Sequence, residues 1–113
     1  ERLCALGPSQ IVITGIRDGN FFVNFTFDAE HGTSDSCRVP VSGSSRPGTG
    51  DIFASIVAAK LLAGVPLSEC VKTAADFIAA CTKASDEACV PVRDGVIFEH
   101  FLSLLATSGH DLC

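Results

Sequence analysis

The stretch SRPGTGDIFASIVAAKLLAG, residues 45–64, decides the fold of this chain. After a loop of small residues, apolar residues and alanines recur at helical spacing from Asp51 to Ala63. Gly64 then stands where a residue in the left-handed conformation ends many helices. Only Asp51 and Lys60 are charged in this segment, and a helix that is apolar on almost every side is normally enclosed. The stretch therefore predicts a helix that is buried inside a larger body.

The residues before this helix have the two-residue period of strands. A β-branched run is followed by an alternating apolar and polar segment, with turn and loop residues between the runs. The expected strands cover residues 10–14, 21–27 and 37–41, separated by a turn at residues 17–20 and a polar loop at residues 28–36. These first 41 residues predict a small β meander.

The residues after Gly64 return to helical spacing. A second helix is expected over residues 67–85, a linker over residues 86–94, and a third helix over residues 96–105. Strands come first and helices follow, without an internal repeat. The order predicts the α/β class, with a few short strands and three helices.

The composition excludes several classes of protein. With a net charge of −5 and only eight Lys and Arg, the 113-residue chain has no basic stripe that would attract a nucleic acid. No apolar run approaches the roughly 20 residues that span a bilayer, so we expect no contact with a membrane. Six evenly spread cysteines without a C-x-x-C pair, and three histidines that do not cluster, predict reduced intracellular thiols and no metal site.

The loop before the first helix has the composition of an anion site. A helix N-terminus leaves backbone N–H groups unpaired, and Gly48, Thr49 and Gly50 let an oxyanion approach them without meeting bulky side chains. The loop is not a P-loop, because Thr49 and Gly50 stand where that motif requires Lys and Ser or Thr. It also lacks the third glycine of a dinucleotide fingerprint, since residue 53 is Phe.

Asp51 has two compatible interpretations. It caps the helix with its carboxylate, or it acts as a general base that accepts a proton from a substrate hydroxyl as that hydroxyl attacks a γ-phosphorus. Arg46 is expected to be solvated, with phosphate binding as the alternative. Lys60 lies too far along the helix to reach the same phosphate.

The motif PGTGDIFASIVAAKLLAG resembles the second signature of the ribokinase-like (PfkB-type) kinases, and is most similar to bacterial pyridoxal and pyridoxamine kinases. Two further stretches agree. The sequence IVITG, residues 11–15, resembles the late sheet strand that meets the nucleotide, and RDGVIFE, residues 93–99, resembles the closing helix of those kinases. The resemblance implies a three-layer α/β/α fold and ATP-dependent phosphorylation of the 5′-hydroxymethyl group of a B6 vitamer.

The resemblance also implies roles for individual residues. Gly48, Thr49 and Gly50 would form the anion hole, and Asp51 would be the catalytic base. Thr14 and Gly15, at the end of the first strand, would lie near the phosphates or ribose of ATP. Residues around 21–27 would loosely flank the adenine, although hairpin packing is the simpler interpretation of the phenylalanines.

Family chains are much longer than this one and place most substrate contacts and the acidic Mg²⁺ motif in their amino-terminal half. Residues 1–113 are therefore expected to be one domain or fragment, the ATP-side carboxyl-terminal portion of a cytoplasmic, dimerising kinase, and to be inactive alone. The alternatives are part of a sugar, nucleoside or hydroxymethylpyrimidine kinase. Hydroxymethylpyrimidine kinases often have Cys at the position of Asp51, so the Asp is less typical of them. A nucleotide-binding module or an inert fragment is the non-enzyme alternative.

Overall fold

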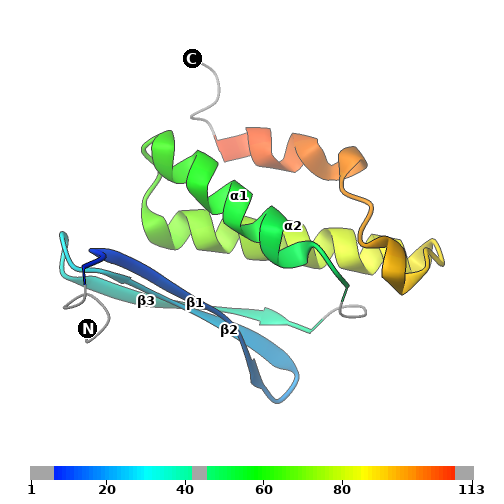
Figure 1. The fold of residues 1–113 in the computed structure, drawn as a ribbon, viewed down its shortest axis with the longest axis horizontal. Helices are drawn as coiled ribbons and strands as arrows, with labels where there is room; N and C mark the ends of the chain where they lie inside the picture. Colours follow the sequence, from blue (N-terminus) through cyan, green and yellow to red (C-terminus); the bar gives the residue numbers. More distant parts are fainter. Residues whose placement is uncertain (1–6, 42–45, 109–113) are drawn as a thin grey trace.

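A computed structural model describes residues 7–41 and 46–108 of the chain. Three antiparallel strands form one sheet in the order β1-β2-β3, which confirms the predicted β meander (Figure 1). The strands are β1 (Gln10–Asp18), β2 (Phe21–Asp28) and β3 (Thr33–Pro40).

The strands are longer than the sequence pattern predicts. The predicted turn at residues 17–20 is reduced to Gly19 and Asn20, with Gly19 at a φ of 59°, because Arg17 and Asp18 pair with residues of β2. The predicted polar loop at residues 28–36 is likewise too long, since β3 already begins at Thr33. In both places the ladder with the apolar strand β2 extends through residues whose own composition favours a turn.

A bulge interrupts β1 and explains its glycine. Between the pairs that Ile13 and Ile16 form with β2, both Thr14 and Gly15 stand opposite Asn24. Gly15 takes a φ of 72°, which a residue with a side chain rarely adopts, and its N–H donates to Asn24 Oδ1 at 2.9 Å. Thr14 and Gly15 therefore lie within a strand, and the expectation that they end it is wrong.

Two α-helices follow, α1 (Thr49–Leu62) and α2 (Leu67–Glu87). Gly64 has a φ of 90°, as expected for the residue that ends α1. The expected third helix is not α-helical: η2 (Val92–Asp94) and η3 (Glu99–Ser108) are 3₁₀ segments. Residues 95–98 between them are not helical because Gly95 has a φ of 76° and the N–H of Ile97 donates to Ser85 Oγ on α2.

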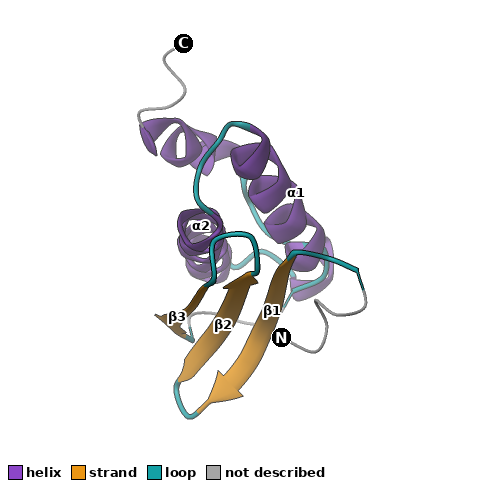
Figure 2. Ribbon diagram, turned by 90° about the vertical axis from the view of Figure 1, so that its left-hand side faces the viewer, coloured by secondary structure: helices purple, strands orange, loops and turns teal. Residues whose placement is uncertain are grey.

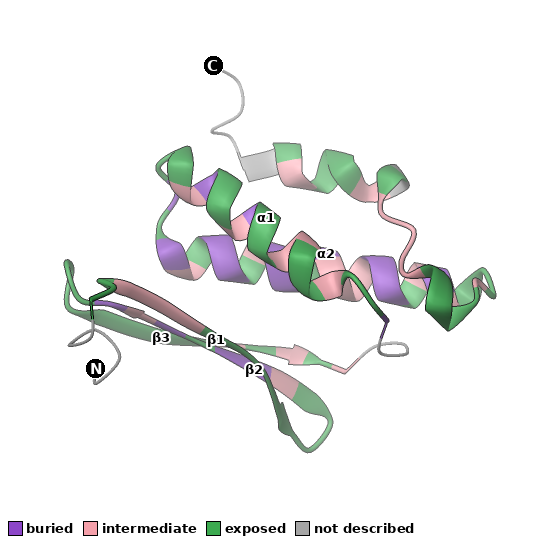
Figure 3. Ribbon diagram, viewed as in Figure 1, coloured by how far each residue is buried: buried purple, intermediate pink, exposed green. Residues whose placement is uncertain are grey.

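The helices all lie on one side of the sheet, with α2 next to it (Figure 2). The core forms between α1, α2 and η3 around Ile56, Ala74, Phe77 and Cys81, and buried residues are concentrated on α2 (Figure 3). None of the described helices is long and apolar enough to cross a membrane.

The described residues do not enclose α1 on nearly all sides, so its burial inside a larger body stays a prediction. Within α1 only Ile56 and Lys60 are buried, and Leu62 is 91% exposed. One side of α1 packs on α2, and no other described element covers the opposite side. The helix α1 therefore carries more apolar surface than the described residues bury.

Candidate functional site

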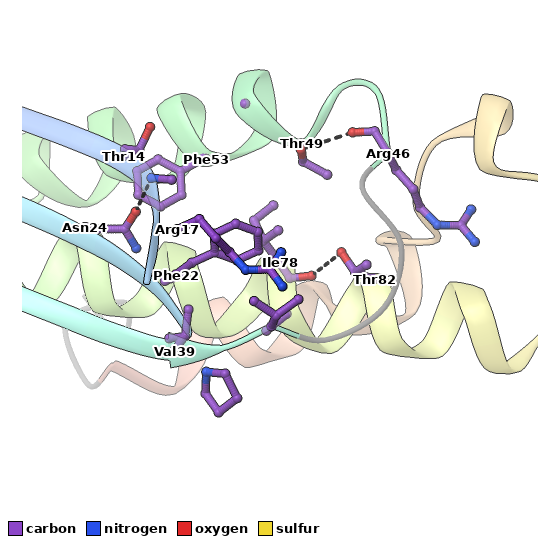
Figure 4. Close-up of a pocket in the computed structure, with 16 residues that line it drawn as sticks. Thr14, Arg17, Phe22, Asn24, Val39, Arg46, Thr49, Phe53, Ile78 and Thr82 are labelled. Carbon is purple, nitrogen blue, oxygen red and sulfur yellow. Dashed lines mark hydrogen bonds between the residues drawn. The ribbon is translucent and has the colours of Figure 1, made fainter. Parts of the chain in front are cut away.

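A cavity of about 300 Å³ lies where the sheet meets the N-terminal half of α1 and the middle of α2 (Figure 4). Strand β1 contributes its bulge, and α1 contributes its first turn. Its wall includes Thr14, Gly15, Arg17, Phe22, Thr49 and Gly50. Of the predicted site residues, the structure therefore brings Thr14, Gly15, Thr49 and Gly50 to one cavity.

The bend before α1 leaves its backbone accessible. Gly48 is the N-cap of α1, with a φ of 85°, and its carbonyl accepts from the N–H of Ile52 at 3.1 Å. Apart from the adjoining residues and the nearby backbone of α1, no described atom lies within 4 Å of where a Cβ would stand on Gly48 or Gly50. The N–H groups of the first turn have no helical partner, so an anion can approach them through this open space.

Thr49 fixes the shape of the bend with its side chain. Its hydroxyl donates to the carbonyl of Arg46 at 3.2 Å, which closes the loop over Pro47 and Gly48 (Figure 4). Thr49 lines the cavity, whereas Gly48 does not. Of the three residues predicted to form an anion hole, Thr49 and Gly50 therefore border the cavity, and Gly48 is the turn residue before them.

Asp51 lies in the first turn of α1 but outside the cavity wall. Its side chain is exposed, and among the described residues no hydrogen bond or ion pair engages its carboxylate. The interpretation of Asp51 as a hydrogen-bonding cap is wrong, because the N-cap is Gly48 and α1 has no side-chain cap. Its negative charge still lies at the favourable end of the helix dipole.

Arg46 is not solvated, contrary to expectation. Its side chain is 1% exposed, and its two Nη atoms donate to Asp86 Oδ1 at 2.7 Å and to the carbonyls of Val90, Pro91 and Gly95 at 2.7–3.2 Å. Figure 4 shows the guanidinium turned away from the cavity. Arg46 therefore anchors the loop to the end of α2, and its position gives no support to phosphate binding.

Lys60 lies about three turns beyond the bend, too far to reach the same phosphate, as the sequence predicts. It is buried, and its Nζ donates to the carbonyl of Leu105 in η3. Its ammonium therefore joins α1 to η3, at a place away from the cavity.

The phenylalanines of β2 divide between two faces of the sheet. Phe22 faces the cavity together with Asn24, whereas Phe25 and Phe27 line a shallow groove on the opposite face. Only part of the segment expected to flank an adenine is therefore in place to do so. The register could have been found in the sequence, because a two-residue turn at Gly19 and Asn20 places Arg17 opposite Phe22.

Asp28, Glu30 and His31 form a polar cluster at the turn between β2 and β3. The Asp28 carboxylate accepts from Gln10, from the N–H groups of Glu30 and His31, and from His31 Nδ1 at 2.8 Å. The hydrogen bond between the two side chains lowers the pKa of Asp28 and raises that of His31. These bonds account for the cluster as a turn structure, and we assign no metal to it.

The described cysteines are free thiols. Burial raises the pKa of Cys70 and raises that of Cys81 to about 11, so both are protonated and unreactive near neutral pH. Cys4 and Cys113, and the loop residues 42–45, lie outside the described residues.

A match to a known protein family shows which family this fold and loop belong to. The sequence profile of the phosphomethylpyrimidine kinases matches residues 1–92. The chain belongs to the phosphomethylpyrimidine kinase family. This membership confirms the kinase resemblance inferred from the loop and helix. No curated protein matches the chain.

Solved structures show the same fold as this member of the phosphomethylpyrimidine kinase family. A putative phosphomethylpyrimidine kinase from Bacteroides thetaiotaomicron is 24% identical, with a TM-score of 0.86 over 93% of this chain and 37% of that chain. The pyridoxal kinase from Lactobacillus plantarum is 24% identical, with a TM-score of 0.75 over 89% of this chain and 37% of that chain. The pyridoxal kinase from Entamoeba histolytica is 20% identical, with a TM-score of 0.70 over 94% of this chain and 37% of that chain.

These likenesses confirm the predicted fold class, a small α/β unit of the kind found in pyridoxal kinases. The chain spans about 37% of the length of the solved structures that it matches.

Proposed function

We propose that this chain is the nucleotide side of a small-molecule kinase, in which it binds ATP with the terminal phosphoryl group at the start of α1. The observation that carries the proposal is the open bend at Gly48–Gly50, which borders a cavity in a chain of a kinase family. The N–H groups of the bend stabilise charge on the transferred group. The apolar part of the cavity, including Phe22 and Phe53, accepts the rest of the nucleotide.

Asp51 acts as the general base in this proposal. Its exposed carboxylate has no competing partner among the described residues and lies one residue beyond Gly50. It accepts the proton of the acceptor hydroxyl as that oxygen forms a bond to the γ-phosphorus, and the bond from phosphorus to the β–γ bridging oxygen breaks to release ADP. Because Asp51 lies outside the cavity wall, the acceptor approaches from the solvent side of the first turn of α1.

Mg²⁺, which the family resemblance implies, is not matched by the described cavity. Mg²⁺ prefers carboxylate and water oxygens, and no carboxylate lines the described part of the cavity wall. The described residues of the cavity wall therefore do not fit the ion, and the proposed reaction gives none of them the role of a metal ligand.

The acceptor that we propose is the 5′-hydroxymethyl group of a B6 vitamer. Two of the solved relatives are pyridoxal kinases, and one crystal form of the Bacteroides thetaiotaomicron protein contains pyridoxal. The description of the matching family favours a phosphomethylpyrimidine as the second candidate. A cytoplasmic location and a homodimer belong to the same proposal and rest on the resemblance alone.

Calorimetric titration of the 113-residue chain with ATP, ADP and pyridoxal tests the proposal. We expect both nucleotides to bind and pyridoxal to give no heat, because the chain spans about 37% of its solved relatives. We also expect no phosphorylation of pyridoxal by this chain alone. If neither ATP nor ADP binds, the proposed nucleotide site is overturned. If this chain alone phosphorylates pyridoxal, the proposal that the rest of the active site lies on further polypeptide is overturned.

The variant Asp51→Asn separates binding from chemistry. It should bind ATP at least as well as the unchanged chain, since a negative charge near the phosphates is removed. In a protein completed to the length of its relatives, the same substitution should lower kcat by roughly 10²- to 10⁴-fold, the usual contribution of a general base. The two candidate acceptors, pyridoxal and the phosphomethylpyrimidine (hydroxymethylpyrimidine phosphate), are distinguished by testing both side by side in that protein.

A further inference from the structure

Arg17 is a cationic residue of the cavity wall to which the proposed function gives no role. It lies on β1 just beyond the bulge, directly opposite Phe22 on β2. Its guanidinium carbon is 5.5 Å from the centroid of the Phe22 ring, and its Nε donates to the carbonyl of Gly19 at 2.8 Å. Figure 4 shows the side chain beside Phe22 within the cavity. Arg17 is exposed, and the ring and the carbonyl favour this orientation of its guanidinium before any ligand arrives.

The charge of Arg17 is not balanced within the cavity. Among the described residues, no carboxylate forms an ion pair with Arg17, and none lines the cavity. The other arginine at this site, Arg46, has its charge paired with Asp86. In a chain with a net charge of −5, an oriented and unpaired cation on a mainly apolar wall favours a ligand with an anionic group.

We propose that Arg17 binds the phosphate chain of the nucleotide and makes the cavity select a nucleoside triphosphate over the uncharged nucleoside. This inference rests on the proposed function, because it places the nucleotide in the same cavity. The Nη groups of Arg17, which have no partner among the described residues, donate to phosphate oxygens while Nε keeps its bond to Gly19. Stacking on Phe22 limits the entropy lost when these bonds form.

Arg38 provides a matched control. Its guanidinium carbon lies 5.2 Å from the centroid of the Phe21 ring, so it forms the same kind of stack as Arg17. It also forms an ion pair with Asp18, and it lies on β3 outside the cavity wall. Arg38→Ala removes the same charge and the same type of ring contact without touching the proposed site.

The test is a titration of the unchanged chain, Arg17→Ala, Arg17→Lys and Arg38→Ala with ATP, ADP, AMP and adenosine. Arg17→Ala should weaken ATP binding about ten- to hundredfold, the effect of losing hydrogen bonds to a charged group, and leave adenosine binding unchanged. Arg17→Lys should give an intermediate loss, and Arg38→Ala should bind every ligand as the unchanged chain does. ATP binding should also depend less on salt in Arg17→Ala than in the unchanged chain.

The outcomes distinguish this inference from the proposed function. Absence of nucleotide binding by the unchanged chain overturns both. If the unchanged chain binds ATP and Arg17→Ala binds it equally well, the role of Arg17 is refuted while the nucleotide site stands. Equal weakening of ATP and adenosine also refutes it, because Arg17 would then act only by shaping the cavity through Phe22. Circular dichroism of each variant confirms that the sheet is intact.

Discussion

At the scale of single residues, the structure needs Gly48 and Gly50, on either side of Thr49, for different reasons. Gly48 has a φ of 85°, so its lack of a side chain serves the backbone. Gly50 is within α1 at an ordinary helical φ and borders the cavity, so its lack of a side chain serves access to the N–H groups. Substitution of each by alanine therefore separates folding from binding.

We expect Gly48→Ala to lower the free energy of unfolding by about 1–2 kcal/mol, the cost of a left-handed alanine. Gly50→Ala should leave that free energy unchanged or raise it by less than about 1 kcal/mol, because alanine favours helix. The same variant should weaken ATP binding about tenfold or more, since a methyl group would stand between the phosphate and the backbone. Urea unfolding and calorimetry measure the two effects, and full ATP binding by Gly50→Ala would contradict the anion site.

At the scale of elements, the loop before α1 is held to the end of α2 by Arg46. This one side chain bonds Asp86 and three backbone carbonyls while its own carbonyl accepts from Thr49. Arg46→Ala removes four hydrogen bonds made by a buried guanidinium, one of them to a carboxylate, so we expect the free energy of unfolding to fall by about 3–5 kcal/mol. Arg46→Lys should recover part of the loss, because a lysine keeps the charge but not the planar fork.

Urea unfolding measures the Arg46 prediction, and Arg93→Ala is its control. Arg93 is 88% exposed, and the nearest atoms of its pair with Asp94 are 4.0 Å apart, so its removal should change stability by less than about 1 kcal/mol. Similar unfolding midpoints for Arg46→Ala and Arg93→Ala would show that the buried contacts of Arg46 do not hold the loop.

The elements themselves show what periodicity can and cannot predict. The strand β2 and the helices α1 and α2 follow from apolar spacing and from Gly64, and their bounds differ by no more than two residues from those expected. The C-terminal end of β1 and the start of β3 do not follow, because pairing with β2 outweighs the turn-forming composition of residues 17–18 and 33–36. The 3₁₀ geometry of residues 99–108 depends on packing against α2, which no local pattern records.

At the scale of the whole molecule, the cavity joins segments that are far apart in the chain. The bulge of β1 and the bend before α1 are more than 30 residues apart, and α2 closes the site from another 25 residues on. The motif around Gly48 and Gly50 could be found in the sequence, and so could Thr14 and Gly15 through the family resemblance. The pairing of Arg17 with Phe22 could also be found from the two-residue turn, but their place in the cavity could not, because the sequence does not show which side of the sheet α2 covers.

The face of the sheet turned away from the helices carries exposed apolar residues of β1 and β2 beside polar residues of β3, and no described helix covers it. Ile13 and Phe25 form a cross-strand pair there and are 46% and 44% exposed, and Ile16 on the same face is 42% exposed. Exposed apolar surface of this kind drives association in water. The chain spans about 37% of its solved relatives, so the polypeptide that they have in addition is available to cover such a face in them.

We therefore expect the 113-residue chain by itself to self-associate through this face as its concentration rises. The double variant Ile13→Thr/Phe25→Thr keeps residues that favour strands but removes much of the apolar surface, and it should lower the association constant at least about tenfold. Leu62→Gln is the control, because Leu62 is 91% exposed but lies on α1, away from the sheet. Sedimentation velocity at matched concentrations measures the effect. If Leu62→Gln abolished association and the double variant did not, the contact would lie on α1 and the open face of the sheet would not be the surface that brings copies together.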